Sequence, residues 1–142
     1  MPKEESHVLH IITQSFILPI IIAFLSLRVM PSLDEIDVLV VSFFGSLLPD
    51  IDHINIWFEY KFKDFKSFIK FVAKARRYRY SFLIFHNLAA MIVILLLIPL
   101  VRPKNPLASV FLVAFLLHLF LDFIDDKISI GRVTHWRYRR KT

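Results

Sequence analysis

Four side chains that could bind a metal ion lie in or at the ends of strongly apolar stretches of the sequence. His86 stands near the start of one stretch, His118 and Asp122 lie four residues apart in another, and Asp50 follows a third. Ionisable groups within a hydrophobic span are costly to insert into a membrane and commonly mark a functional site. Imidazoles and carboxylates without thiolates form the ligand set of catalytic zinc, manganese or iron sites, in which one open position holds water. The sequence therefore predicts a divalent metal site.

The segment LPDIDH at residues 48–53 carries further candidates for this site. Pro49 interrupts helical hydrogen bonding, so a local turn can direct two carboxylates and an imidazole inward. We expect Asp52 to act as a metal ligand or as a general base, and His53 to bind metal or to orient a carboxylate. The structural alternative is that the segment only caps a helix and that His118 and Asp122 form a pair joining two helices.

The elements that must position these groups are apolar helices. The chain has 142 residues, of which 56% are hydrophobic, and no cysteine, which excludes disulfides, thiolate zinc sites and cysteine nucleophiles. We expect one all-α domain over 1–142, an integral membrane four-helix bundle plus an interfacial amphipathic helix. The spans are expected at about 8–29, 36–57, 81–101 and 107–124. The apolar core of the second is short, so it either dips partway into the membrane or continues as helix through LPDIDH.

The basic residues predict the orientation of this bundle. The net charge is +6, and with four crossings only Arg28, Arg102 and Lys104 of the 18 lysines and arginines face the side opposite the termini. Positive residues concentrate on the cytoplasmic side, so both termini are expected in the cytoplasm. At about 1.5 Å per helical residue, the four candidate ligands then lie about 8 to 13 Å below the cytoplasmic face. His7 or His10, at the cytoplasmic mouth of the first helix, is a further candidate ligand.

Two basic segments predict contacts with lipid. Residues 58–78 alternate phenylalanine with lysine at helical spacing, which is typical of an amphipathic helix lying among headgroups. The tail at 127–142 repeats the pattern of aromatic and basic residues. We expect both segments to bind anionic headgroups. Nucleic acid is the alternative partner, but the sequence has no groove-reading motif or aromatic RNA-binding platform, so it is not expected.

These residues carry a resemblance to a known family. The stretch Gly45 to His53, the later His86 and the HLFLD motif of residues 118–122 resemble the YdjM-like membrane-bound metal-dependent hydrolases, a family grouped with the zinc-dependent phospholipase C and P1-nuclease superfamily. The resemblance implies a hydrolase, most often zinc-dependent, that acts on a phosphoester. It assigns motif positions to His7, Asp50, Asp52 or His53, His86, His118 and Asp122. The chain departs from the family pattern at Ser81, where a histidine is usual.

The sequence leaves the function open between three classes. The leading expectation is a hydrolase whose bound metal activates water against a phosphoester of a lipid or amphiphile at the cytoplasmic face. The first alternative is a non-catalytic scaffold or partner-binding protein in which the buried polar pairs lock helix packing. The second is a small transporter in which histidine and aspartate relay protons or metal.

Overall fold

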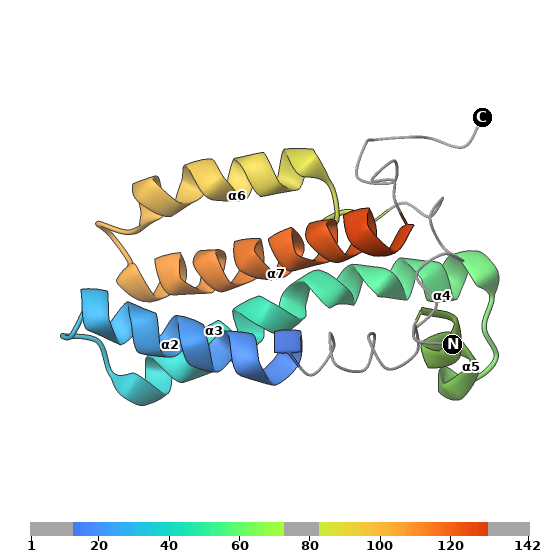
Figure 1. Cartoon of the computed structure of the whole chain (residues 1–142), viewed down its shortest axis with the longest axis horizontal. Coiled ribbons are helices and arrows are strands. Elements are labelled where there is room, and N and C mark those ends of the chain that lie inside the picture. The colour runs from blue at the N-terminus through green and yellow to red at the C-terminus, as the bar shows by residue number, and fades with distance from the viewer. Residues whose placement is uncertain (1–12, 73–82, 131–142) are drawn as a thin grey trace.

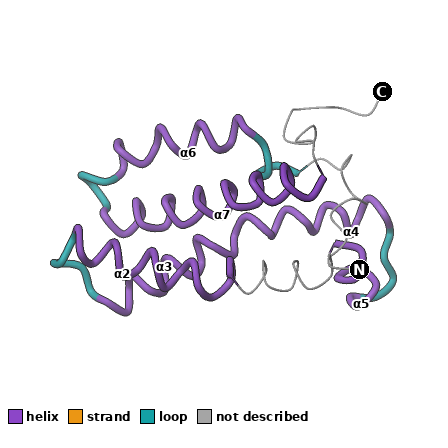
Figure 2. The backbone as a smooth tube through the Cα atoms, viewed as in Figure 1, coloured by secondary structure: helices purple, strands orange, loops and turns teal. Residues whose placement is uncertain are grey.

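The computed structural model of the chain describes residues 13–72 and 83–130, and every regular element in these ranges is a helix (Figure 2). This confirms the all-α prediction. The predicted ligand His7, its alternative His10, Ser81 and the part of the tail from residue 131 lie outside the described residues. The elements are a π-helical turn η1 (Thr13–Ile17), α2 (Leu18–Val29), α3 (Glu35–Leu47), the 3₁₀ turn η2 (Leu48–His53), α4 (Ile54–Tyr60), α5 (Phe65–Val72), α6 (Leu88–Val101) and α7 (Pro106–Ile130).

Two long helices dominate this arrangement (Figure 1). α3, η2 and α4 form one continuous helix of 26 residues from Glu35 to Tyr60, so the second apolar segment continues through LPDIDH rather than stopping there. α7 packs against α3, α2 and α6. Among the described residues, Glu35–Tyr60 and Pro106–Asp125 are long and apolar enough to cross a membrane, whereas α2 and α6 have only 12 and 14 residues.

Side chains at helix starts explain where α3 and α6 begin. The carboxylate of Asp34 accepts the backbone N–H groups of Ile36 and Asp37, and the side-chain oxygen of Asn87 accepts that of Ala90. The expected third span from residue 81 is therefore wrong at its start. α6 begins at Leu88, and His86 lies in the non-helical segment before it.

The single amphipathic helix expected over 58–78 is also wrong in its first part. Residues 58–60 complete α4, and Lys61 then takes a left-handed conformation (φ 53°) that ends it. The chain turns back, and α5 starts after Asp64, whose carboxylate accepts the N–H and hydroxyl of Ser67. Aromatic rings hold the two helices together, with ring centroids 5.2 Å apart for Trp57 and Phe68. Residues 73–78 lie outside the described part of the chain.

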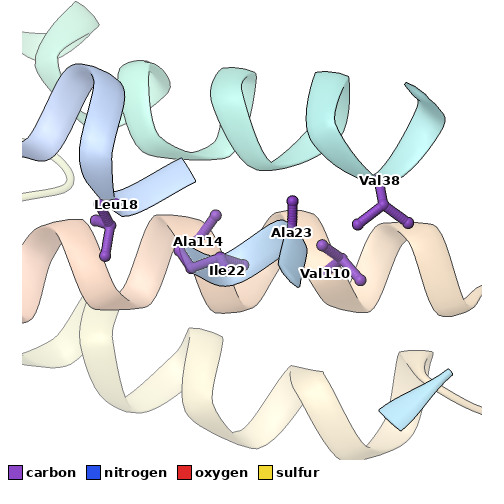
Figure 3. Close-up of a cluster of buried hydrophobic side chains, with 6 residues drawn as sticks. All are labelled: Leu18, Ile22, Ala23, Val38, Val110 and Ala114. Carbon is purple, nitrogen blue, oxygen red and sulfur yellow. The ribbon is translucent and has the colours of Figure 1, made fainter. Parts of the chain in front are cut away.

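The apolar core lies where α2, α3 and α7 meet (Figure 3). Its buried members are Leu18, Ile22, Ala23, Val38, Val110 and Ala114. Gly45 lets α3 and α7 approach closely, because a Cβ atom at this position would lie 2.5 Å from the carbonyl oxygen of Phe111 and 2.9 Å from Cβ of Ala114. This close approach brings the next turn of the long helix, which carries Asp50, against α7.

Candidate metal centre

Four ionisable side chains from three separate stretches of the chain converge beyond Gly45. Asp50 comes from η2, His86 from the segment before α6, and His118 and Asp122 from α7. One ligand atom from each lies within 4.8 Å of all the others. Nε2 of His86 lies 2.7 Å from Oδ2 of Asp122, and Nε2 of His118 lies 3.2 Å from the same oxygen. Two imidazoles and two carboxylates thus face one point.

The burial of these four groups is uneven. The side chains of His118 and His86 are 0% and 4% exposed, whereas that of Asp50 is 49% exposed. Oδ1 of Asp50 lies 3.5 Å from Nε2 of His118, so Asp50 completes the cluster on its accessible side. An ion held here would be enclosed by the imidazoles and reachable past Asp50, which is the arrangement of a catalytic rather than a closed structural metal site.

The 3₁₀ turn explains how neighbouring residues of LPDIDH reach different positions. With three residues per turn, Asp50 and His53 lie on one side of η2, and Nδ1 of His53 is 3.5 Å from Oδ1 of Asp50. Asp52 is rotated away from Asp50, and its carboxylate faces the segment before α6. The proline therefore tightens the helix instead of breaking it, and the tightening separates the two carboxylates.

Asp52 holds His86 from the side opposite Asp122. Nδ1 of His86 lies 3.0 and 3.1 Å from the two carboxylate oxygens of Asp52. One of these oxygens also accepts the backbone N–H groups of Phe85 at 2.9 Å and of His86 at 3.3 Å. When Nδ1–H donates to Asp52, the lone pair of the neutral ring lies on Nε2, toward Asp122. A carboxylate that orients a histidine in this way is typical of metal sites.

His53 lies beside this pair. Its Nδ1 is 3.4 Å from Oδ1 of Asp52, and its ring meets that of His86 edge to face with centroids 4.8 Å apart. Asp52, His53 and His86 also offer ligand atoms that lie within 4.8 Å of one another, so they form a second possible metal site. In that second set, His86 and Asp52 already contact each other through Nδ1 of His86, and backbone N–H groups occupy one oxygen of the Asp52 carboxylate. The set containing Asp50, His118 and Asp122 is therefore the better candidate.

The electrostatics of the cluster favour a positive charge. Burial alone would lower the pKa of His86, which precedes α6 and lies outside the candidate membrane-spanning helices. The hydrogen bonds with Asp122 and Asp52 outweigh burial and raise this pKa to about 10, because both carboxylates stabilise the protonated ring. The same carboxylates would stabilise a divalent cation, and metal binding would release the proton.

Sequence reasoning placed Asp50, His86, His118 and Asp122 together, and the structure brings these four groups to one point. Their role as metal ligands stays a prediction, as do those of Asp52 and His53. The sequence did not predict two features of the site: the backbone N–H groups that anchor Asp52, and the position at which α6 starts. An asparagine directly before a long apolar run is a helix-start signal, so Asn87 could have shown that His86 precedes the helix.

Comparison with known proteins identifies one family. The family described as YdjM inner membrane protein matches residues 10–128, which include every group of the candidate centre. Neither the curated proteins nor the solved structures gave a match. The description gives a location in the inner membrane and names no reaction.

Proposed function

The chain belongs to the YdjM inner membrane protein family, and we propose that it is a membrane-bound, metal-dependent hydrolase acting on a phosphoester. The observation that carries this proposal is the convergence of two buried imidazoles and two carboxylates, one of them accessible. Zinc suits this donor set best, and manganese or iron are the alternatives. The metal ligands are Asp50, His86, His118 and Asp122, with the predicted contribution of His7 outside the described residues.

The proposed topology is multi-pass with both termini in the cytoplasm. The two long helices supply two crossings, and α2, extended by η1, and α6 supply the others. Arg28 lies in the last turn of α2, and Arg102 and Lys104 lie between α6 and α7, at the end of the bundle away from the metal centre. The positive-inside rule then places the metal centre toward the cytoplasm. Exposed Lys63 and Lys66 on or beside α5, together with the basic tail, would bind anionic headgroups.

The chemistry divides between the ion and the residues around it. A bound divalent ion would polarise a phosphoryl oxygen and lower the pKa of a bound water. With the ion bound, a hydrogen bond from Nδ1–H of His86 to Asp52 would direct the lone pair of Nε2 toward that ion. The Asp52 side chain is only 1% exposed, and backbone N–H groups occupy one of its oxygens, so it is poorly placed as a general base. His53 is 12% exposed beside Asp50 and is the better group to hold or accept a proton.

Metal analysis of the purified protein in lipid nanodiscs tests the proposal. We expect the parent protein to hold about one divalent ion per chain and His118→Ala to lose it. We also expect His118→Ala to hydrolyse a panel of phosphodiesters and phospholipids more than about 100-fold more slowly, because even changes to residues that only orient metal ligands cost about 10- to 100-fold. His135→Ala in the basic tail is the matched control and should keep both. Absence of metal from the unmodified chain, or hydrolysis unaffected by His118→Ala, would contradict the proposal and favour the scaffold.

A further inference from the structure

An apolar groove begins at the candidate metal centre and runs between α4 and α5. It has a volume of about 610 Å³. Asp50 and His53 line the end at the centre, and the remainder is lined chiefly by Ile54, Trp57, Phe58, Phe65, Phe68 and Ile69. The groove is thus polar where it meets the centre and hydrophobic along the rest of its length.

The floor of the groove is packed against the protein, whereas the side chains along its opening are exposed. Phe68 on α5 is only 8% exposed and packs against Ile56 and Leu83, so the floor is part of a buried cluster. Phe58 and Phe65 are 70% and 67% exposed, and they leave large apolar surfaces along its opening. Large exposed apolar patches commonly mark binding surfaces. Because the floor is fixed by the protein, a chain lying in the groove would contact side chains rather than only neighbouring lipids.

The charge at the metal end of the groove indicates which kind of headgroup the ligand carries. Lys61 and Lys63 follow the end of α4 that is away from Asp50, and the exposed carboxylates of Glu59 and Asp64 lie beside them, so these lysines do not determine the charge of the headgroup. The metal centre would add a cation at the end near Asp50. A ligand with an anionic headgroup at the centre and an alkyl chain along the aromatic wall satisfies both features.

The volume of the groove is that of a binding site for a small molecule. Ligand pockets of about 300–1,000 Å³ are the normal range for a small molecule.

We propose that this groove binds an alkyl chain of the substrate, so that the substrate is an amphiphilic phosphoester whose headgroup reaches the metal centre from the groove. The inference rests on the proposed hydrolase function, which supplies the headgroup site. The bilayer is as apolar as the groove, so the chain alone gains little by entering it. Occupancy must therefore depend on the headgroup, which distinguishes the substrate from surrounding lipid.

Fluorescence quenching of Trp57 tests this dependence without any reaction. Replacing Trp136 by phenylalanine leaves Trp57 as the single tryptophan of the chain. The protein is placed in phosphatidylcholine nanodiscs that contain a low mole fraction of an alkylphosphonate with a brominated chain, an unreactive analogue of a phosphoester. The comparison probe is brominated phosphatidylcholine at the same mole fraction, and metal content is measured on the same samples.

We expect the brominated phosphonate to quench Trp57 at least about ten-fold more effectively than brominated phosphatidylcholine. Unbrominated dodecylphosphonate should reverse the quenching. Ile54→Ser, which places a hydroxyl in the groove, should weaken this quenching while leaving bound metal unchanged. Ile36→Ser is the matched control at an exposed isoleucine near the start of α3, and it should behave like the parent protein.

Equal quenching by the two brominated probes would overturn the inference, because the groove would then hold ordinary boundary lipid. Normal metal content without quenching by the phosphonate would also overturn it and would leave the hydrolase proposal standing. Absence of metal would instead be a failure of the hydrolase proposal, which the metal measurement reports independently of fluorescence.

Discussion

The two ends of the long helix pair are built from opposite kinds of side chain. At the end where both helices begin, Val38 and Val110 are 0% and 1% exposed and pack with α2 in an apolar core. At the other end, the same two helices present Asp50, His118 and Asp122 to one point. Gly45 lies between the two ends, where α3 passes close to the backbone of α7. One pair of helices thus provides both the packing and the candidate chemistry.

This comparison shows what holds each end in place. The apolar end needs only complementary shape, because its side chains have no polar groups to satisfy. The polar end needs a third stretch of chain, since His86 and the backbone anchors of Asp52 come from the segment before α6. The polar end is therefore more sensitive to single polar changes, while a change at Gly45 should affect both ends.

Gly45→Val should have the largest effect on stability. A Cβ atom alone would lie 2.5 Å from the Phe111 carbonyl oxygen, and backbone cannot move away cheaply. We expect a loss of at least about 3 kcal/mol of unfolding free energy, together with loss of bound metal, because α3 and α7 are forced apart. Reversible unfolding in mixed detergent micelles and metal analysis measure the two effects. Full metal content in a stable Gly45→Val protein would show that the close approach does not position the centre.

Asp52→Asn should affect the polar end selectively. The amide keeps the size of the carboxylate but removes the charge that orients and polarises His86, so metal affinity should fall about 10- to 100-fold. Competition with a metal-binding dye measures this affinity. Asp34→Asn makes the same change at the start of α3, where asparagine caps a helix as well as aspartate, and should leave affinity unchanged. An equal loss in both variants would mean that general charge, not the contact with His86, controls binding.

Ser42→Ala should have the smallest effect. The hydroxyls of Ser42 and Ser46 are buried without a hydrogen-bond partner among the described residues, so removing one loses no bond. We expect a change within about 1 kcal/mol, in the stabilising direction, in the same unfolding assay. Ser109→Ala is the matched control, because its buried hydroxyl donates to the carbonyl oxygen of Pro106. That control should be destabilising, and a clear destabilisation by Ser42→Ala would reveal a partner for its hydroxyl.

The helices were predictable to the extent that hydropathy and spacing determine them. The apolar runs at 107–124 and 36–57 correspond to α7 and to the helix from Glu35 to Tyr60, although both observed helices are longer. The start of α6 was not predicted, because Leu83 and Phe85 are as apolar as the helix that follows. Their apolarity serves a different purpose: Leu83 is buried in the cluster beneath α5. Burial in a loop and burial in a helix give the same hydropathy signal.

The candidate site was predictable in its membership but not in its arrangement. The four-residue spacing of His118 and Asp122 placed them on one face of a helix, which the structure retains. The separation of Asp50 from Asp52 depends on the 3₁₀ geometry of the turn, and sequence alone does not distinguish it from a break in the helix. The groove beside the centre depends on how α5 folds back onto α4 after Lys61, a tertiary contact that the amphipathic pattern did not predict.

The sequence order of the four groups has a consequence for biogenesis. Asp50 is synthesised early, His86 follows, and both groups on α7 emerge last. A nascent chain that ends before α7 lacks two of these four groups, so it should not retain an ion during insertion into the membrane. Metal acquisition would then act as the final step of assembly, after every helix has entered the bilayer.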